Sequence, residues 1–195
     1  DAPLVADMSS EIMSRAIDVN RFGIIYAGAQ KNIGPSGLAL VIIHKTLLDR
    51  CPETIQVFHR YRTHVTGSSL YNTPNTWGIY MVGLVTDWLL ELGGVASIEA
   101  INQRKASLLY DMLDSSDFWR TPVRKQCRSI MNVVWRIHDE ELEPRFLKEA
   151  RAADLAGLKG HRSVGGLRAS IYNACPLESI ELLVSFMRDF ESRNG

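Results

Sequence analysis

The sequence predicts an α/β fold, in which short apolar strands and longer helices pack in layers. Apolar runs at residues 4–6, 23–27 and 38–43 are typical of strands in a sheet that is covered on both faces. A helical pattern follows at 75–92 and ends at Gly93 and Gly94, since glycine favours helix termination. Strands and helices then alternate, so we expect a second, smaller α/β layer.

Residues 1–97 are predicted to form the first domain, around the three apolar runs. We expect a turn at 9–14, a short helical turn at 45–51 and an irregular loop at 52–69. The helix at 75–92 is apolar on most sides, which predicts that it is buried in the core.

Residues 98–195 are predicted to form the second domain, packed on one face of its sheet. Ser97 is the expected cap of a helix that runs to about residue 113, and Pro144 lies in the first turn of a helix at 143–155. Strands are expected at 132–137, 159–164 and 167–173, with Gly165 and Gly166 joining the last two. Pro176 begins an amphipathic helix that ends near residue 192 and faces inward with Ile180, Leu183, Val184 and Met187.

Composition limits the classes of function. The 195 residues include 22 basic and 22 acidic side chains with no long like-charge run, so we expect no nucleic-acid or membrane-surface partner. The longest apolar stretch, 79–92, is too short to span a bilayer. The three cysteines are widely spaced, which predicts no metal site, no disulfide framework and a cytoplasmic location. A first residue other than Met suggests a fragment.

Lys31 is the centre of the candidate site. It follows an apolar strand within a glycine-rich turn, with apolar segments on both sides that disfavour the ammonium form. Asp7 ends the preceding apolar run, and strand ends that meet at one edge of a sheet are where open α/β folds bind ligands. An amine and a carboxylate there match a pyridoxal phosphate site. The alternatives are a solvent-exposed lysine and an aspartate that caps the turn at Ser9 and Ser10.

Four segments resemble the phosphoserine aminotransferase family of class V aminotransferases, namely residues 5–10 (VADMSS), 26–35 (YAGAQKNIGP), 71–74 (YNTP) and 159–173 (KGHRSVGGLRASIYN). They follow the family's order almost from end to end of the chain, but the family's N-terminal half has no counterpart. The resemblance implies a fold-type I pyridoxal phosphate-dependent transferase. Residues 1–97 would be the C-terminal part of its large domain, with a mixed, mostly parallel sheet, and 98–195 its small domain.

The resemblance also implies roles at the cofactor. Lys31 would form the Schiff base with pyridoxal 5'-phosphate and carry the proton, and Asp7 would keep the pyridine nitrogen protonated. Gln30 would contact the cofactor phosphate. Asn72 and Thr73 would reach the cofactor phosphate of a neighbouring subunit, which implies a homodimer; the alternative is that they cap the following helix.

The remaining residues concern the substrate. By resemblance Arg168 would bind the α-carboxylate through its planar guanidinium, and His161 and Arg162 would bind the substrate phosphate. Because neighbours on a strand point to opposite faces, both of the latter could reach one ligand only from a bent backbone. The alternative for Arg168 is an ordinary surface arginine.

The implied reaction converts 3-phosphohydroxypyruvate and glutamate to O-phosphoserine and 2-oxoglutarate in serine biosynthesis, and extends to a related substrate of pyridoxine synthesis. Two alternatives stay open. One is another class V enzyme such as a cysteine desulfurase, although Cys127 and Cys175 lack an obvious mobile loop and Gln30 precedes the lysine where those enzymes usually have histidine. The other is a catalytically silent binding or dimerisation module.

Overall fold

The computed structural model describes residues 2–195. The chain divides into two compact units, Asp1–Val95 and Ala96–Gly195, and each is described by itself. The predicted assignment of domains to residues 1–97 and 98–195 stays a prediction.

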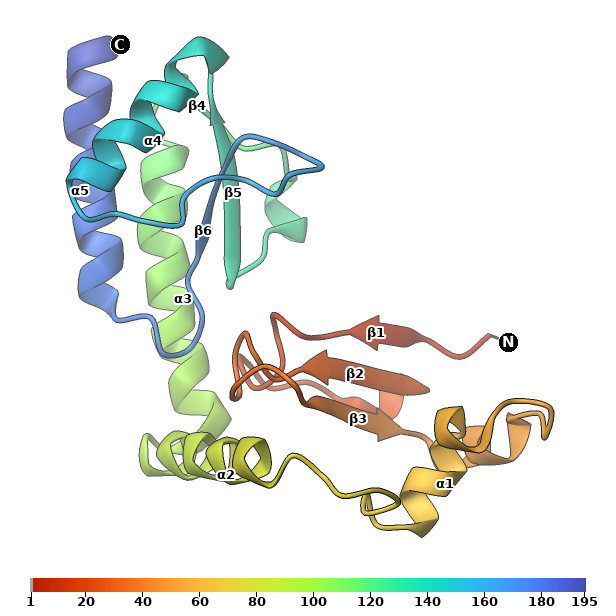
Figure 1. Ribbon diagram of the computed structural model, residues 1–195. Helices are drawn as coiled ribbons and strands as arrows, with labels where there is room; N and C mark the ends of the chain where they lie inside the picture. The colour runs from red at the N-terminus through yellow and green to blue at the C-terminus, as the bar shows by residue number, and fades with distance from the viewer. Residues whose placement is uncertain (1) are drawn as a thin grey trace. The chain divides into compact units, whose positions relative to one another are not determined.

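The first unit is built on a three-stranded sheet in the order β1-β2-β3 (Figure 1). β1 (Val5–Asp7) runs parallel to β2 (Ile24–Gly28), so Asp7 lies beside Tyr26 near the end of both strands. β3 (Ala39–Ile43) is antiparallel to β2, with Gly28 opposite Ala39. The loop 29–38 is too short for the crossover that a parallel third strand needs, and it returns the chain directly.

One face of this sheet is covered within the unit. The loop 29–38 is called the lysine loop below, because it carries Lys31. A small apolar cluster under β2 and the lysine loop comprises Ile12, Ile25, Ala27, Ala29 and Ile33. On the other face Val5 and Tyr26 are 51% and 41% exposed. Leu40 and Ile42 of β3, which lie opposite Ala27 and Ile25 on the covered face, are also more than one third exposed. Among residues 2–195 the sheet is therefore not covered on both faces, because an apolar sequence records what a strand can bury and not what covers it.

The short helical turn expected at 45–51 is confirmed as the 3₁₀ helix Lys45–Arg50. The irregular loop expected at 52–69 holds more structure than predicted, since it contains the 3₁₀ helix Val57–His59 and α1 (Tyr61–Thr66). A further 3₁₀ turn lies upstream at Val19–Arg21. Phe58 packs edge-on against His64 at 5.4 Å between ring centroids and also meets Tyr71. These ring contacts organise a segment that has no clear apolar periodicity.

Helix α2 (Thr76–Glu91) closes the first unit and is capped by Asn75, whose side chain accepts from the Gly78 amide. It approaches the lysine loop closely: a Cβ on Gly78 would lie 2.9 Å from Leu38, and one on Gly34 would lie 2.6 Å from Val82. The expectation of a helix buried on most sides is wrong. Its large exposed apolar side chains include Trp77, at 62% exposure, Ile79, Tyr80, Leu84 and Trp88.

The second unit has an antiparallel sheet in the order β4-β5-β6, formed by Trp119–Arg120, Asn132–Ile137 and Leu167–Ser170. Helices α3 (Gly94–Leu113), α4 (Glu143–Ala152) and α5 (Leu177–Asn194) lie on one side of it, as predicted (Figure 1). Alternate residues of β5 and β6 face these helices in one core, which also buries the four inward residues predicted on α5. Two short 3₁₀ helices, Lys125–Cys127 and Glu140–Leu142, complete the unit.

Two expectations for this unit are wrong. Ser97 lies inside α3, which already begins at Gly94. Residues 159–164 form no strand; Lys159 makes an isolated bridge to Leu167 and a turn follows. Strand β4 has only two residues, too few to produce a pattern in the sequence. Within the part of the chain described, no single helix is long and apolar enough to cross a membrane.

Candidate functional site

Lys31 lies just past the end of β2, on a backbone held on both sides. The amides of Ile33 and Gly34 donate to the Ala29 carbonyl at 3.1 and 2.9 Å, and the buried Asn32 side chain donates to the Ile12 carbonyl at 2.6 Å. The Lys31 side chain itself is exposed, so the expectation of apolar walls around it is wrong within this chain. The loop fixes the lysine's backbone while leaving its amine accessible.

Asp7 ends β1 and is tied to the end of β2 through Ser9. The Ser9 amide and hydroxyl both donate to Asp7 Oδ1, at 2.9 and 2.6 Å, and the Ser9 hydroxyl accepts from the Gly28 amide at 2.9 Å. These Ser9 bonds, with a smaller contribution from the charge of Lys31, hold the pKa of Asp7 below its usual value. Asp7 therefore does cap the turn, and the same bonds keep its carboxylate ionised near the lysine.

Ser10 provides the second link across the site. The Lys31 Nζ donates to the Ser10 hydroxyl at 3.0 Å, so neighbouring serines hold the carboxylate and the amine. The sequence predicts no more than a turn for Ser9 and Ser10. Their position two and three residues after Asp7 is the signal that the sequence offers, but their partners on β2 and its loop became visible only in the folded chain.

Gln30 completes the first group of residues. A Cβ on Gly28 would lie 2.6 Å from Gln30 Oε1, so the Gln30 side chain folds back over the Gly28 backbone. The structure thus brings Asp7, Gln30 and Lys31 to one edge of the sheet, as predicted. The third strand, β3, is antiparallel to β2, so it begins at this edge and does not end there.

Asn72 and Thr73 lie exposed on the segment before α2. The Asn72 amide donates to the Thr73 carbonyl at 3.0 Å. Because Asn75 caps α2, the alternative that Asn72 and Thr73 are the helix caps is wrong. Their assignment to a cofactor phosphate stays a prediction.

Arg168 lies on β6 in the second unit, on the sheet face opposite the helical core. It is paired in register with Val134 and half-buried, and its Nε is buried without a hydrogen-bond partner in the part of the chain described. On the same face the Ser170 hydroxyl donates to Asn132 Oδ1 at 3.0 Å. An unsatisfied buried donor is costly, and no acceptor among residues 2–195 meets this one.

His161 and Arg162 are exposed on the connection between α4 and β6. This segment is a turn, so the objection that neighbours on a strand point to opposite faces does not apply. His161 Nδ1 and the Ser163 hydroxyl are hydrogen-bonded at 2.7 Å, which orients the imidazole ring.

Metal-ion chemistry and a nucleophilic cysteine find less support in the structure. Among residues 2–195 no group of three His, Cys, Asp or Glu side chains is placed to hold a metal ion. The three cysteines are free thiols, and burial raises the pKa of the half-buried Cys175 thiol, which lowers the fraction present as the reactive thiolate.

Comparison with known proteins agrees with this geometry. The family model described as aminotransferase class V matches residues 1–183. Curated phosphoserine aminotransferases of Lysinibacillus sphaericus and Acinetobacter baumannii are 52% and 55% identical to the chain; all of the chain is matched, but only 54% of each relative. The chain thus spans about half the length of the curated relatives it matches.

Solved structures give the same result. Phosphoserine aminotransferase from Bacillus circulans subsp. alkalophilus superposes with a TM-score of 0.94 at 50% identity, over 99% of this chain and 54% of that one. The pyridoxal phosphate-bound enzyme of Trichomonas vaginalis superposes with a TM-score of 0.90 at 38% identity, over 96% and 54%. The mixed α/β architecture is therefore that of part of a fold-type I transferase, and the chain belongs to the class V aminotransferase family.

Proposed function

We propose that the chain is the catalytic lysine-bearing part of a pyridoxal phosphate-dependent aminotransferase that interconverts 3-phosphohydroxypyruvate plus glutamate and O-phosphoserine plus 2-oxoglutarate. The observation that carries this proposal is the pairing of Asp7 and Lys31 at the ends of parallel strands, each held by a serine hydroxyl. The names of the relatives support the choice of substrates.

Each residue of the lysine site has a task in this proposal. Pyridoxal phosphate, when bound, supplies a ring that accepts the electron pair left when a substrate loses its Cα proton. Lys31 binds the cofactor aldehyde and then moves the proton at Cα. Asp7, kept ionised by Ser9, holds the proton on the pyridine nitrogen. Gln30, Asn72 and Thr73 offer amide and hydroxyl donors to the cofactor phosphate.

The second unit provides the substrate contacts. Arg168, with its buried and unpartnered Nε, binds the α-carboxylate that all four substrates share. His161 and Arg162 bind the phosphate, a group that O-phosphoserine carries and glutamate lacks. The two units correspond in this proposal to part of the large cofactor-binding domain and to the small domain.

Three further features belong to the proposal. The enzyme acts as a homodimer, which the apolar surface of α2 supports. It works in a reducing compartment, the cytoplasm, which the three free cysteines support. It also accepts the related phosphorylated substrate of pyridoxine synthesis, because the same carboxylate and phosphate contacts suit both molecules.

Borohydride reduction in the presence of pyridoxal phosphate tests the central assignment. The purified chain is incubated with the cofactor, reduced, digested and mapped by mass, with Lys31→Ala and the exposed-lysine variant Lys45→Ala alongside. We expect about one label per chain at Lys31, because Ser10 and the anchored loop present this amine beside Asp7. O-phosphoserine should reduce the labelling, and Lys31→Ala should abolish it whereas Lys45→Ala leaves it unchanged.

Labels scattered over surface lysines in the chain alone would favour the silent binding module. The same mapping is then repeated on the full-length protein, together with an assay of glutamate-dependent transamination. Absence of both Lys31 labelling and transamination there would overturn the proposed function.

A further inference from the structure

The connection that carries His161 and Arg162 is closed tightly by its own backbone. The Gly160 amide donates to the Gly166 carbonyl at 2.8 Å, and the amides of Val164 and Gly165 donate to the His161 carbonyl at 2.9 and 2.8 Å. A Cβ on Gly160 would lie 1.9 Å from the Gly165 carbonyl oxygen, so only glycine fits there. Residues 160–166, called the phosphate loop below, therefore have a defined shape although their tip is exposed.

Arg136, on β5, fixes this loop from the side of the sheet. Its Nη2 donates to the Val164 carbonyl at 2.9 Å. A Cβ on Gly165 would lie 3.1 Å from the same nitrogen, and one on Gly166 would lie 3.3 Å from Arg136 Cγ. Both glycines have positive φ, 76° and 69°, so the loop passes directly over the arginine at positions where larger residues would be strained.

The guanidinium of Arg136 is itself held by acidic partners. Glu140 pairs with Nη1 at 2.8 Å and Glu143 at 3.6 Å, and the arginine side chain is only 24% exposed. These contacts offset its charge and fix its direction. Arg136 is consequently poorly suited to bind a substrate anion itself and well suited to hold the loop that does.

We propose that Arg136 is a positioning residue that sets the phosphate loop so that His161 and Arg162 together recognise the phosphate of the substrate. This inference rests on the proposed function and adds the element that determines specificity. Through Arg136, the start of α4, strand β5 and the phosphate loop form one connected support.

The test compares Arg136→Gln, Arg136→Lys and the control Arg120→Gln. Arg120 lies opposite Arg136 in the register of β4 and β5. It also forms an ion pair with Glu140, at 2.7 Å, but the Arg120–Glu140 ion pair does not include the phosphate loop. In the full-length, cofactor-loaded protein, Arg136→Gln should raise the KM for O-phosphoserine about tenfold, equivalent to about 1.4 kcal/mol. The KM for glutamate should change less than about twofold. Arg136→Lys, which keeps the charge and one donor, should recover part of the loss.

Hydrogen exchange gives a second readout that needs no catalysis. In Arg136→Gln the amides of Val164 and Gly165 should exchange at least about tenfold faster, and in Arg120→Gln they should not. Equal behaviour of Arg136→Gln and Arg120→Gln, or an equal rise in both KM values, would overturn the inference. A wild-type protein that does not transaminate at all would instead overturn the proposed function, while the exchange rates would still report whether Arg136 holds the loop.

Discussion

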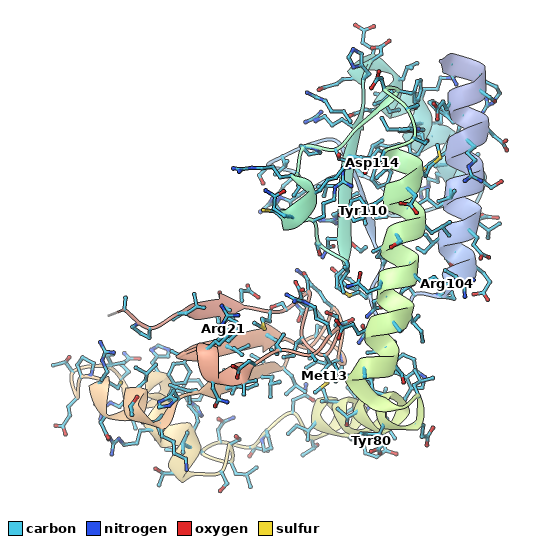
Figure 2. The ribbon with its side chains drawn as sticks, turned by 180° about the vertical axis from the view of Figure 1, so that it is seen from behind. Met13, Arg21, Tyr80, Arg104, Tyr110 and Asp114 are labelled. Atoms are coloured by element: carbon cyan, nitrogen blue, oxygen red, sulfur yellow. The ribbon has the colours of Figure 1, made fainter. Side chains whose placement is uncertain are left out.

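Asp114 and Arg128 form a bidentate ion pair in the second unit. Two parallel bonds join them at 2.7 and 2.8 Å, and the guanidinium also lies 4.6 Å from the centre of the Tyr110 ring. Figure 2 labels Tyr110 and Asp114 near the C-terminal end of α3. The Arg128 hydrogen bond is the main cause that lowers the pKa of Asp114 to about 2, so the pair stabilises the folded state while the carboxylate is charged.

Replacing Asp114 by Asn should lower the free energy of unfolding at neutral pH by about 2 kcal/mol, because Arg128 loses its charged partner. Since the pKa of Asp114 is lower in the folded state, its stabilisation is complete above about pH 5 and is lost as the pH falls through about 4 towards 2. Urea unfolding of both proteins across this range measures the difference. The exposed Asp111→Asn on the same helix serves as control, and a difference that did not shrink in acid would contradict the assignment.

One link between helices and strands is made by the side chain of Lys105, which joins α3 to the connection between β6 and α5. The side chain is fully buried, and its Nζ donates to the carbonyls of Ile171, Tyr172 and Cys175 at 3.1, 2.8 and 3.1 Å. Burial lowers the pKa of this amine, and the three carbonyls compensate for the loss of water. This connection directly follows the strand that carries Arg168.

Lys105→Met should therefore destabilise the chain by about 3 kcal/mol, because it removes the charged donor that three carbonyls share, of which only that of Tyr172 is also shown to accept from the Cys175 amide. Thermal and urea unfolding measure the loss, and amide exchange at 171–175 locates it. Lys148→Met removes an exposed lysine from α4 and should change stability by less than about 0.5 kcal/mol. Similar losses in both variants would show that the three bonds contribute little.

For the molecule as a whole, the apolar surface of α2 is the feature that most needs a partner. Tyr80, labelled on α2 in Figure 2, is 64% exposed, and Trp77 is 62% exposed on the same helix. Contiguous exposed apolar patches of this kind mark interaction sites. The proposed homodimer would cover this surface.

Sedimentation velocity should accordingly show a dimer, and Tyr80→Glu should weaken its association at least about 100-fold, because a charge would be buried without a partner. Leu182→Glu is the matched control, since Leu182 is also 64% exposed but lies on α5 in the other unit. A monomeric wild-type protein, or equal disruption by both variants, would contradict the use of α2 as the dimer surface.

Elements whose signals are local could be predicted from the amino-acid sequence alone. Glycines and apolar runs placed Lys31 after one strand and Asp7 at the end of another, and period and length predicted β5 and the inward face of α5 correctly. The resemblance added the roles of Gln30 and Arg168, which the bare pattern could not distinguish from surface side chains. The placements of Lys31, Asp7, β5 and the inward face of α5 were predicted correctly because turns, strand ends and amphipathic faces depend on near neighbours in the chain, whereas the roles of Gln30 and Arg168 stay predictions.

Features that depend on partners distant in sequence emerged only from the folded chain. It showed that α2 exposes its apolar side chains, that Ser9 and Ser10 hold the carboxylate and the amine, and that Arg136 supports the phosphate loop. An apolar or polar pattern records what a segment is able to bury or bind. Which surface covers it, and which donor meets which acceptor, follows only when the strands and helices are packed together.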